Sequence, residues 1–248
     1  MTRQPRALIA GLGAIGASIG MALRARGWYI LYFDRHEFAG TRDAADARGT
    51  FDDPVDLTIL ATPENVALEL LPHTRGLVTS VCSVMAPLRR AAAGDFVAGH
   101  PMTGTEQSGI EAASRELFAN APSWFIDRRS EVVERMIEDC GARPELVDAA
   151  EHDRAVALVS HLPQLLSTAL ASYLDDRRDA LRFSAGGLRT FLRLAGMGVE
   201  MWAPILAENR DNIAPHTDAV MQIVREMLER DPSPHFTRAQ HLYRSLPK

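Results

Sequence analysis

Short apolar runs alternate with amphipathic stretches along the first part of the chain. The runs are rich in branched and aromatic side chains, and apolar residues recur at helical spacing in the segments between them. This alternation predicts parallel strands joined by helices that cover both faces of one sheet. The expected strands are Arg6–Ala10, Tyr29–Phe33, Leu57–Ala61, Leu77–Val81, Phe96–Gly99, Trp124–Asp127 and Arg143–Leu146. The expected helices are Ile15–Arg26, Glu64–Leu70, Met85–Ala92 and Ser130–Asp139.

A different pattern begins near residue 148. Asp148, followed three residues later by Glu151, resembles a capping box at the start of a long helix that runs past Tyr173. Apolar side chains surround most of this helix, so we expect it to be buried in a bundle or against a second subunit. Further helices are expected at Leu188–Leu194, Glu200–Met227 and near Thr237–Arg244.

These two patterns predict two domains. Residues 1–148 are expected to form an α/β domain with a Rossmann-type, doubly wound parallel sheet, and residues 149–248 an all-helical C-terminal dimerisation domain. A domain of only about 100 residues has little interior in which to bury such an apolar helix. We therefore expect a homodimer joined through the helical domain.

Composition narrows the range of partners. The formal net charge of −5 provides no basic surface for nucleic acid. No apolar run approaches the roughly 18 residues of a membrane span, and the amino terminus leads directly into the first strand. Cys82 and Cys140 form neither a disulfide framework nor a cluster with metal-ligand spacing. These observations predict a cytoplasmic protein without a metal and without a nucleic-acid or membrane partner.

A glycine-rich turn follows the first expected strand and opens the first expected helix. Gly11 permits a tight turn, Gly13 lets the backbone approach a pyrophosphate, and Gly16 allows the helix to pack closely on the strand. The diphosphate would lie at the positive amino end of that helix. The turn predicts a dinucleotide site formed by Gly11, Leu12, Gly13, Ala14, Ile15 and Gly16.

The second expected strand is followed by Asp34, at the offset typical of a carboxylate that hydrogen-bonds the ribose 2′-hydroxyl. Its charge would repel a 2′-phosphate, which favours NAD over NADP. Arg35 beside it could receive that phosphate or stack on the adenine, so NADP stays the less favoured alternative. Thr62 and Pro63, which follow the third expected strand, complete the predicted cofactor-binding set.

His100 stands at the end of the expected strand Phe96–Gly99. In an open parallel sheet, ligands bind outside the carboxyl ends of the strands, so this imidazole would face the cofactor cleft. Pro101 restrains His100 to an extended geometry, and imidazole is well suited to accept a proton near neutral pH. A histidine before a proline is also common as a structural loop residue, so its neighbours decide the interpretation.

Several segments together resemble the prephenate/arogenate dehydrogenase family. They are the histidine loop at 99–109, Ser83-Val84, Ser160-His161-Leu162-Pro163, and Met201-Trp202 followed by Asn209. The resemblance extends from about residue 6 to about residue 228. It implies an NAD-dependent oxidative decarboxylation in tyrosine biosynthesis. In this reaction a cyclohexadiene carboxylate loses hydride from C4 to NAD, its C1 carboxylate leaves as carbon dioxide, and the ring becomes aromatic.

The resemblance also implies roles for individual residues. His100 would accept the proton of the C4 hydroxyl, and Ser83 would hydrogen-bond near that hydroxyl and the nicotinamide. Arg193 would bind a substrate carboxylate through its guanidinium fork, and Glu106 would pair with this arginine. The residues implied in substrate binding are Arg193, Gln164, His161, Glu106, Thr105, Ser160 and Trp202.

Structural roles stay open for several of these side chains. Ser83 could cap the helix that follows it, and His161 and Trp202 could belong to an apolar core. Arg193 could be a surface charge, which is the role we expect for Arg189, four positions earlier on the same helix face.

Gln164 and Met85 depart from the family pattern. Many relatives carry a second histidine in place of Gln164 and a basic residue in place of Met85. Both changes affect the substrate more than the reaction, so 4-amino-4-deoxyprephenate is an alternative substrate. A dinucleotide-binding sensor without turnover is an alternative of another class, which the joint presence of His100, Ser83 and Arg193 disfavours.

Overall fold

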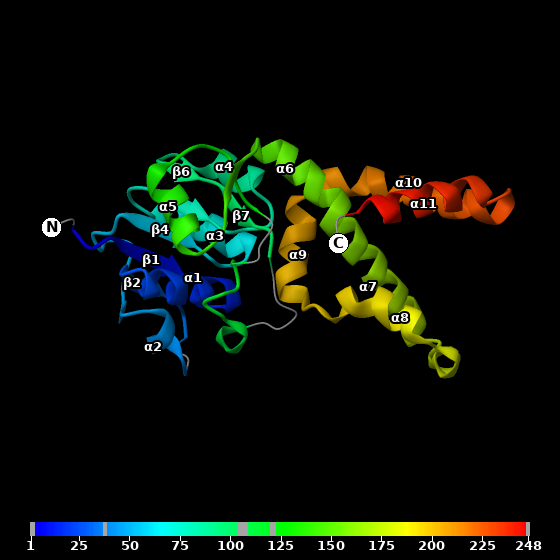
Figure 1. The fold of residues 1–248 in the computed structure, drawn as a ribbon, viewed down its shortest axis with the longest axis horizontal. Helices are drawn as coiled ribbons and strands as arrows, with labels where there is room; N and C mark the ends of the chain where they lie inside the picture. Colours follow the sequence, from blue (N-terminus) through cyan, green and yellow to red (C-terminus); the bar gives the residue numbers. More distant parts are fainter. Residues whose placement is uncertain (1–2, 37–38, 104–108, 120–122, 247–248) are drawn as a thin grey trace.

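A six-stranded parallel sheet forms the centre of the first domain in the computed structural model, which describes residues 3–36, 39–103, 109–119 and 123–246 (Figure 1). Its strand order is β3-β2-β1-β4-β5-β6, and every neighbouring pair is parallel. Ala10 at the end of β1 lies opposite both Phe33 and Leu60, at the point where the strand order reverses. The strands are β1 (Arg6–Ala10), β2 (Tyr29–Phe33), β3 (Ala47–Arg48), β4 (Leu57–Leu60), β5 (Val78–Ser80) and β6 (Phe96–Val97).

Helices cover both faces of this sheet, because its strands are apolar on both sides. One buried cluster joins the sheet to α1 and α5 through side chains such as Ile19 and Met136. A second cluster joins it to α3 and α4 through Ala67 and Leu88. The helices are α1 (Ala14–Ala25), α2 (Thr41–Ala44), α3 (Glu64–Leu70), α4 (Ala86–Ala91) and α5 (Glu131–Asp139), with short 3₁₀ turns η1 (Leu71–His73) and η2 (Ile110–Ala112). The predicted doubly wound parallel sheet is confirmed.

A second, three-stranded sheet departs from the sequence expectation. It contains β7 (Gly99–Pro101), β8 (Trp124–Ile126) and β9 (Pro144–Leu146), with β7 antiparallel to β8. The expected strand Phe96–Gly99 therefore divides between the two sheets, and His100 lies within β7 instead of following a strand of the main sheet. Gly99 permits this change, because a Cβ there would come within 2.8 Å of the Ser80 carbonyl oxygen.

The second domain begins with one continuous helical segment of 27 residues, Ala149–Asp175. It consists of α6 (Ala149–Val156), a π-helical turn η3 (Ala157–His161) and α7 (Leu162–Asp175). The Asp148 carboxylate accepts a hydrogen bond from the Glu151 N–H at 2.9 Å, as the capping pattern predicts. The widened turn ends two residues before Pro163, which has no N–H to donate to the regular helix pattern.

By length and composition, Ala149–Asp175 is the one helix within the described ranges that could cross a membrane. The expectation that no segment spans a membrane rests on the lack of an uninterrupted apolar run, and this helix does carry polar side chains such as His161 and Gln164. A core helix of a soluble protein meets the same criterion. Only 33% of the most apolar 18-residue stretch of this helix is buried in the single chain.

Among the remaining helices, α9 lies beside the sheet domain and contacts α3, whereas α10 and α11 reach farthest from it (Figure 1). These remaining helices are η4 (Arg178–Phe183), α8 (Gly186–Phe191), η5 (Leu192–Gly196), α9 (Val199–Glu208), α10 (Arg210–Glu229) and α11 (Ser233–Ser245). The expected helix Glu200–Met227 is thus two helices, which meet at the buried Asn209. The expected helix Leu188–Leu194 likewise divides into α8 and η5.

Candidate functional site

The glycine-rich turn leaves β1 at the reversal of strand order, where α/β sheets bind ligands. Gly11 has φ +96°, and a Cβ there would lie 2.5 Å from the Ala61 carbonyl oxygen. A Cβ at Gly16 would lie 1.9 Å from the Gly11 carbonyl oxygen, so both positions exclude larger residues. At Gly13, in contrast, a Cβ would meet no atom within 4 Å. The open space beside Gly13, at the start of α1, fits a diphosphate group.

Asp34 is fixed against this turn. Its Oδ2 accepts a hydrogen bond from the Leu12 N–H at 2.8 Å, and its Oδ1 accepts one from the His36 N–H at 3.0 Å. Arg35 is exposed beside it, and Arg48 donates to the Asp34 carbonyl oxygen at 2.9 Å. The acid therefore lies at the end of β2 next to the glycine turn, as a ribose-binding carboxylate requires.

Thr62 and Pro63 follow β4 on the other side of the reversal. The Thr62 Cγ2 methyl would lie 2.9 Å from a Cβ at Gly11, so this threonine is next to the turn. Pro63 is the N-cap of α3. Both predicted cofactor-binding positions therefore lie at the same end of the sheet as the glycine turn.

His100 is half-buried, and its Nδ1 lies 3.0 Å from Nε2 of His152. The two rings meet edge to face, with an interplanar angle of 86°. Burial, with smaller contributions from the neighbouring His152 and His161, lowers the pKa of His100 from 6.5 to about 3. His100 is therefore a neutral imidazole at physiological pH, the form that can accept a proton.

His152 is itself held by the adjacent Asp153, whose Oδ1 lies 2.9 Å from its Nδ1. Both side chains are buried on α6. The two Asp153 oxygens also accept hydrogen bonds from the N–H groups of Met85 and Ala86, each at 2.8 Å. Asp153 of the helical domain thus supplies hydrogen-bond acceptors for the free N–H groups at the amino end of α4 in the sheet domain. No side chain of α4's own N-cap residue does so.

Ser83 lies just before α4 and is half-buried. Its N–H donates to Oε1 of Glu64 at 2.9 Å. Burial raises the pKa of the Glu64 carboxyl, while hydrogen bonds from backbone N–H groups oppose that rise. The N-cap position of α4 is Met85, so the alternative role of Ser83 as helix cap does not apply.

His161 and Trp202 lie next to each other, and Asn209 connects His161 to the backbone of Asp153. The Asn209 side-chain amide donates to the Asp153 carbonyl oxygen at 2.8 Å and lies 3.0 Å from Nδ1 of His161. The rings of His161 and Trp202 meet edge to face, with their centroids 5.8 Å apart. Burial lowers the pKa of His161 to about 4, although Asp153 opposes this shift.

Two buried polar atoms near this cluster have no hydrogen-bond partner among the described residues. They are Oε1 of Gln164 and Nε1 of Trp202. The amide nitrogen of Gln164 is fixed by Leu194 O at 2.9 Å and by Thr168 Oγ1 at 3.1 Å. A buried acceptor and a buried donor without partners are costly, and a polar ligand would satisfy both.

Arg189 and Arg193 together line one hollow of about 770 Å³, whose other lining residues belong to α8, to η5 and to the segment 184–185 before α8. Both arginines are exposed in the single chain. Ser160 is half-buried on η3. Thr105 and Glu106, both predicted to bind substrate, lie outside the described residues.

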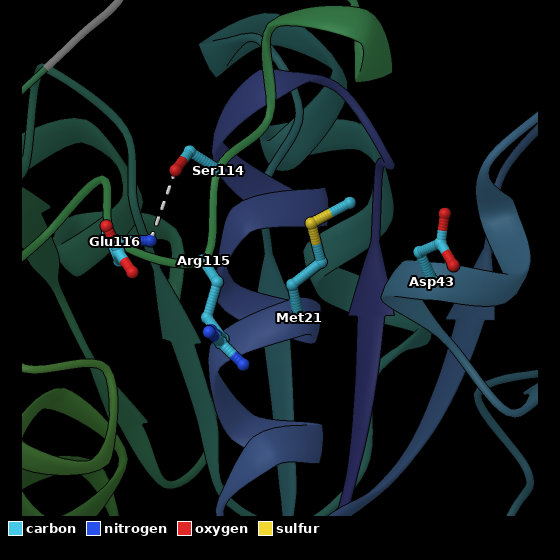
Figure 2. Close-up of a pocket in the computed structure, with 5 residues that line it drawn as sticks. All are labelled: Met21, Asp43, Ser114, Arg115 and Glu116. Carbon is cyan, nitrogen blue, oxygen red and sulfur yellow. Dashed lines mark hydrogen bonds between the residues drawn. The ribbon is translucent and has the colours of Figure 1, made fainter.

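A second hollow, of about 440 Å³, lies against α1 (Figure 2). It is lined by Met21, Asp43, Ser114, Arg115 and Glu116, none of which belongs to the predicted site. Figure 2 shows the Ser114 hydroxyl accepting a hydrogen bond from the Glu116 N–H, a contact of 3.2 Å.

The structure thus joins predicted residues that are far apart in sequence, and it adds residues that the sequence analysis missed. His152, Asp153 and Glu64 were not predicted. An adjacent histidine and aspartate after a helix cap carry no sequence signal of their own, because such a pair is usually solvated. Among the described residues, no group of three or more histidine, cysteine or acidic side chains could hold a metal ion.

Comparisons with known proteins agree with this architecture. The nucleotide-binding domain of prephenate dehydrogenase matches residues 19–146 as a family model, and the prephenate dehydrogenase dimerization domain matches residues 148–239. A prephenate dehydrogenase of Lactococcus lactis is 30% identical over 260 aligned residues, which cover 90% of this chain and 72% of that protein. The two family models thus cover most of the chain, over residues 19–146 and 148–239.

Solved structures are similar over nearly the whole chain. A prephenate dehydrogenase from Aquifex aeolicus, in complex with hydroxyphenyl propionate and NAD+, has a TM-score of 0.83 at 23% identity and covers 98% of both chains. A Synechocystis arogenate dehydrogenase has a TM-score of 0.72 at 26% identity and covers 95% of this chain and 96% of its own. Because both domains match their family models, this chain belongs to the prephenate dehydrogenase family and is a dehydrogenase with a Rossmann-type nucleotide-binding domain.

Proposed function

We propose that this enzyme catalyses the NAD-dependent oxidative decarboxylation of prephenate or arogenate, in tyrosine biosynthesis and in the cytoplasm. The observation that carries the proposal is the neutral imidazole of His100, held by His152 at the junction of the two domains. A dehydrogenase that oxidises an alcohol needs such a proton acceptor. A sensor that only binds a dinucleotide needs none.

The cofactor-binding set is the glycine turn at 11–16 with Asp34, Arg35, Thr62 and Pro63. NAD, when bound, supplies the acceptor for the hydride of C4. The Asp34 carboxylate, fixed by the Leu12 N–H, would hydrogen-bond the ribose and repel a 2′-phosphate, which supports NAD over NADP. We propose residues 1–148 as the cofactor-binding domain and residues 149–248 as the substrate and dimerisation domain.

In the reaction, His100 accepts the proton of the C4 hydroxyl while the carbon–oxygen bond gains double-bond character. Ser83 is the proposed hydrogen-bonding partner of that hydroxyl. The electron pair of the C1–carboxylate bond then enters the ring, and carbon dioxide leaves as the ring becomes aromatic. Deprotonation and decarboxylation thus need one base and one carboxylate positioned for departure.

The helical domain supplies the proposed contacts to the rest of the substrate. Arg193 is the proposed carboxylate partner, and Thr105 and Glu106 of the histidine loop stay proposed substrate-binding residues on the resemblance alone. Oε1 of Gln164 and Nε1 of Trp202, the two buried atoms without partners, suit the polar side chain of the substrate. His161 and Ser160, which lie on η3 just before Gln164, complete the proposed substrate-binding residues. An amide oxygen accepts from an ammonium group, which supports an amino-acid side chain such as that of arogenate.

A homodimer is supported by apolar side chains that the single chain leaves exposed on the helical domain. Leu228 is 83% exposed and Tyr243 is 79% exposed. Further large apolar residues exposed there are Tyr173, Phe183, Phe191, Val199, Phe236 and Leu242. Exposed apolar surface on this scale is typical of an interface between subunits.

The proposed function predicts that prephenate or arogenate will be oxidised with NAD faster than with NADP. The measurement is the absorbance of reduced cofactor, with each substrate and with 4-amino-4-deoxyprephenate. A preference for NADP would contradict the role of Asp34. Turnover of the amino analogue alone would favour the alternative substrate, and cofactor binding without any turnover would favour a sensor.

His100→Asn should lower kcat by roughly 10²–10⁴-fold, the usual contribution of a general base, with NAD affinity and melting temperature retained. The matched control is His73→Asn, the same change at an exposed histidine of the sheet domain, which should leave kcat unchanged. Wild-type turnover in the His100 variant would show that another group accepts the proton.

Arg193→Ala should lower kcat/KM for the ring substrate by about tenfold or more, mainly through KM, because a charged hydrogen bond is lost. Arg193→Lys should be intermediate, since lysine keeps the charge without the fork. NAD affinity should not change, and Arg90→Ala, at an exposed arginine of α4, is the control. Because Arg189 lines the same hollow, an effect of Arg189→Ala alone would assign the carboxylate to that residue.

The homodimer predicts a mass of twice the 27.2 kDa chain by light scattering at micromolar concentration. Leu228→Glu should shift the equilibrium toward monomer, because a carboxylate would be buried in the interface. Leu146→Glu, at an exposed leucine of β9 in the sheet domain, is the matched control. A wild-type protein that is monomeric under these conditions would refute the dimer.

A further inference from the structure

A continuous series of hydrogen bonds leads from the backbone of α4 to His100. The N–H groups of Met85 and Ala86 donate to the carboxylate of Asp153. This carboxylate also faces Nδ1 of His152 at 2.9 Å, and Nε2 of His152 lies 3.0 Å from Nδ1 of His100. His152 and Asp153 are each only 2% exposed, so water does not replace these contacts.

The donors and acceptors in this series determine where each proton lies. Asp153 is an acceptor for the two backbone N–H groups, so the ring nitrogen that faces the same carboxylate has to donate. Nδ1 of His152 therefore carries hydrogen, and in the neutral ring Nε2 is left as an acceptor. An acceptor at Nε2 of His152 requires that Nδ1 of His100 donates. Nε2 of His100 is then the atom with a free lone pair.

We propose that His152 is a positioning residue, which Asp153 orients so that His100 carries its proton on Nδ1 and presents Nε2 as the proton acceptor. The inference rests on the proposed function, in which His100 accepts the proton of the substrate hydroxyl. It adds a second histidine and an aspartate that the sequence analysis did not assign.

The surroundings of His152 support this role over a purely structural one. The ring lies against Phe125 of β8, at a centroid distance of 5.7 Å, and edge to face against His100. Within the described part of the chain, the titratable groups that face His100 are His152 from α6 and His161 from η3. A structural role would be served by an apolar side chain of similar size. Because one nitrogen of His152 faces Asp153 and the other faces His100, the orientation set by Asp153 determines the tautomer of His100.

A protonated His152 would reverse which nitrogen of His100 carries hydrogen. A protonated His152 would donate from Nε2 to Nδ1 of His100, and the proton of neutral His100 would then lie on Nε2. In that state Nε2 could not accept a proton from the substrate. The two arrangements differ by the position of one hydrogen on His100, which can be observed directly.

The first experiment compares His152→Leu with His152→Gln. Leucine removes the acceptor for His100, so kcat should fall by about tenfold or more, as expected when the tautomer of a catalytic histidine is no longer fixed. KM and NAD affinity should change little, because His152 is not proposed to touch either ligand. Glutamine can accept from His100 and donate to Asp153, so it should restore most of the lost kcat. His73→Leu, at an exposed histidine, is the control.

Two outcomes would overturn the inference in folded variants, as judged by melting temperature. One is wild-type kcat in His152→Leu. The other is a glutamine variant as slow as the leucine variant, which would show that the hydrogen-bonding groups of His152 do not matter.

The second experiment uses the unmodified protein, so it does not depend on how a variant folds. Nitrogen NMR of histidine-labelled enzyme at neutral pH should show His100 protonated on Nδ1 and unprotonated on Nε2, with its signals assigned by their loss in His100→Asn. A proton on Nε2 of His100 would refute the inference. If His100→Asn instead kept full activity, the proposed base would be wrong while the NMR result would still test the tautomer.

Discussion

The buried carboxylate of Asp153 is the contact on which the site depends. It accepts hydrogen bonds from two N–H groups at the start of α4, it faces the imidazole of His152, and the carbonyl oxygen of the same residue accepts from Asn209. A buried charge that loses its donors is strongly destabilising, by about 3–5 kcal/mol for a broken buried pair. The sheet domain and helices α6 and α10 are therefore held in one arrangement around this group.

This arrangement keeps the imidazoles of His100 and His161 neutral. His100 and His161 are removed from water beside other imidazoles, and their pKa values fall to about 3 and about 4. Among the residues that the structure describes, Asp153 is the acidic side chain in contact with this cluster, and its two oxygens already accept hydrogen bonds from backbone N–H groups. The fold thus provides an imidazole that is unprotonated before substrate arrives, and a nearby ring that sets which nitrogen is available.

The helical domain differs from the sheet domain in how its apolar surface is covered. The strands of the main sheet are buried by helices on both faces, whereas several large apolar side chains of α10 and α11 are exposed in the single chain. The long helix Ala149–Asp175 is buried where it meets the sheet domain, around His152 and His161, and is more exposed toward its end. A second copy of the chain would complete this domain in the same way that helices complete the sheet.

The sequence by itself determined the features that depend on neighbouring residues. The glycine turn before α1, the alternation of strands and helices and the cap at Asp148 all arise from interactions within a few positions, and each family motif is a short run of neighbouring residues. Only the tertiary structure decided the second sheet, the break at Asn209 and the meeting of His100 with His152, 52 residues apart. The second sheet depends on the close approach of Gly99 in β7 to the Ser80 carbonyl oxygen in β5. The position of His152 depends on the hydrogen bonds between the Asp153 carboxylate and backbone N–H groups of the sheet domain. Hydrophobic periodicity does not encode such contacts, because it records which face is buried and not which polar atoms meet there.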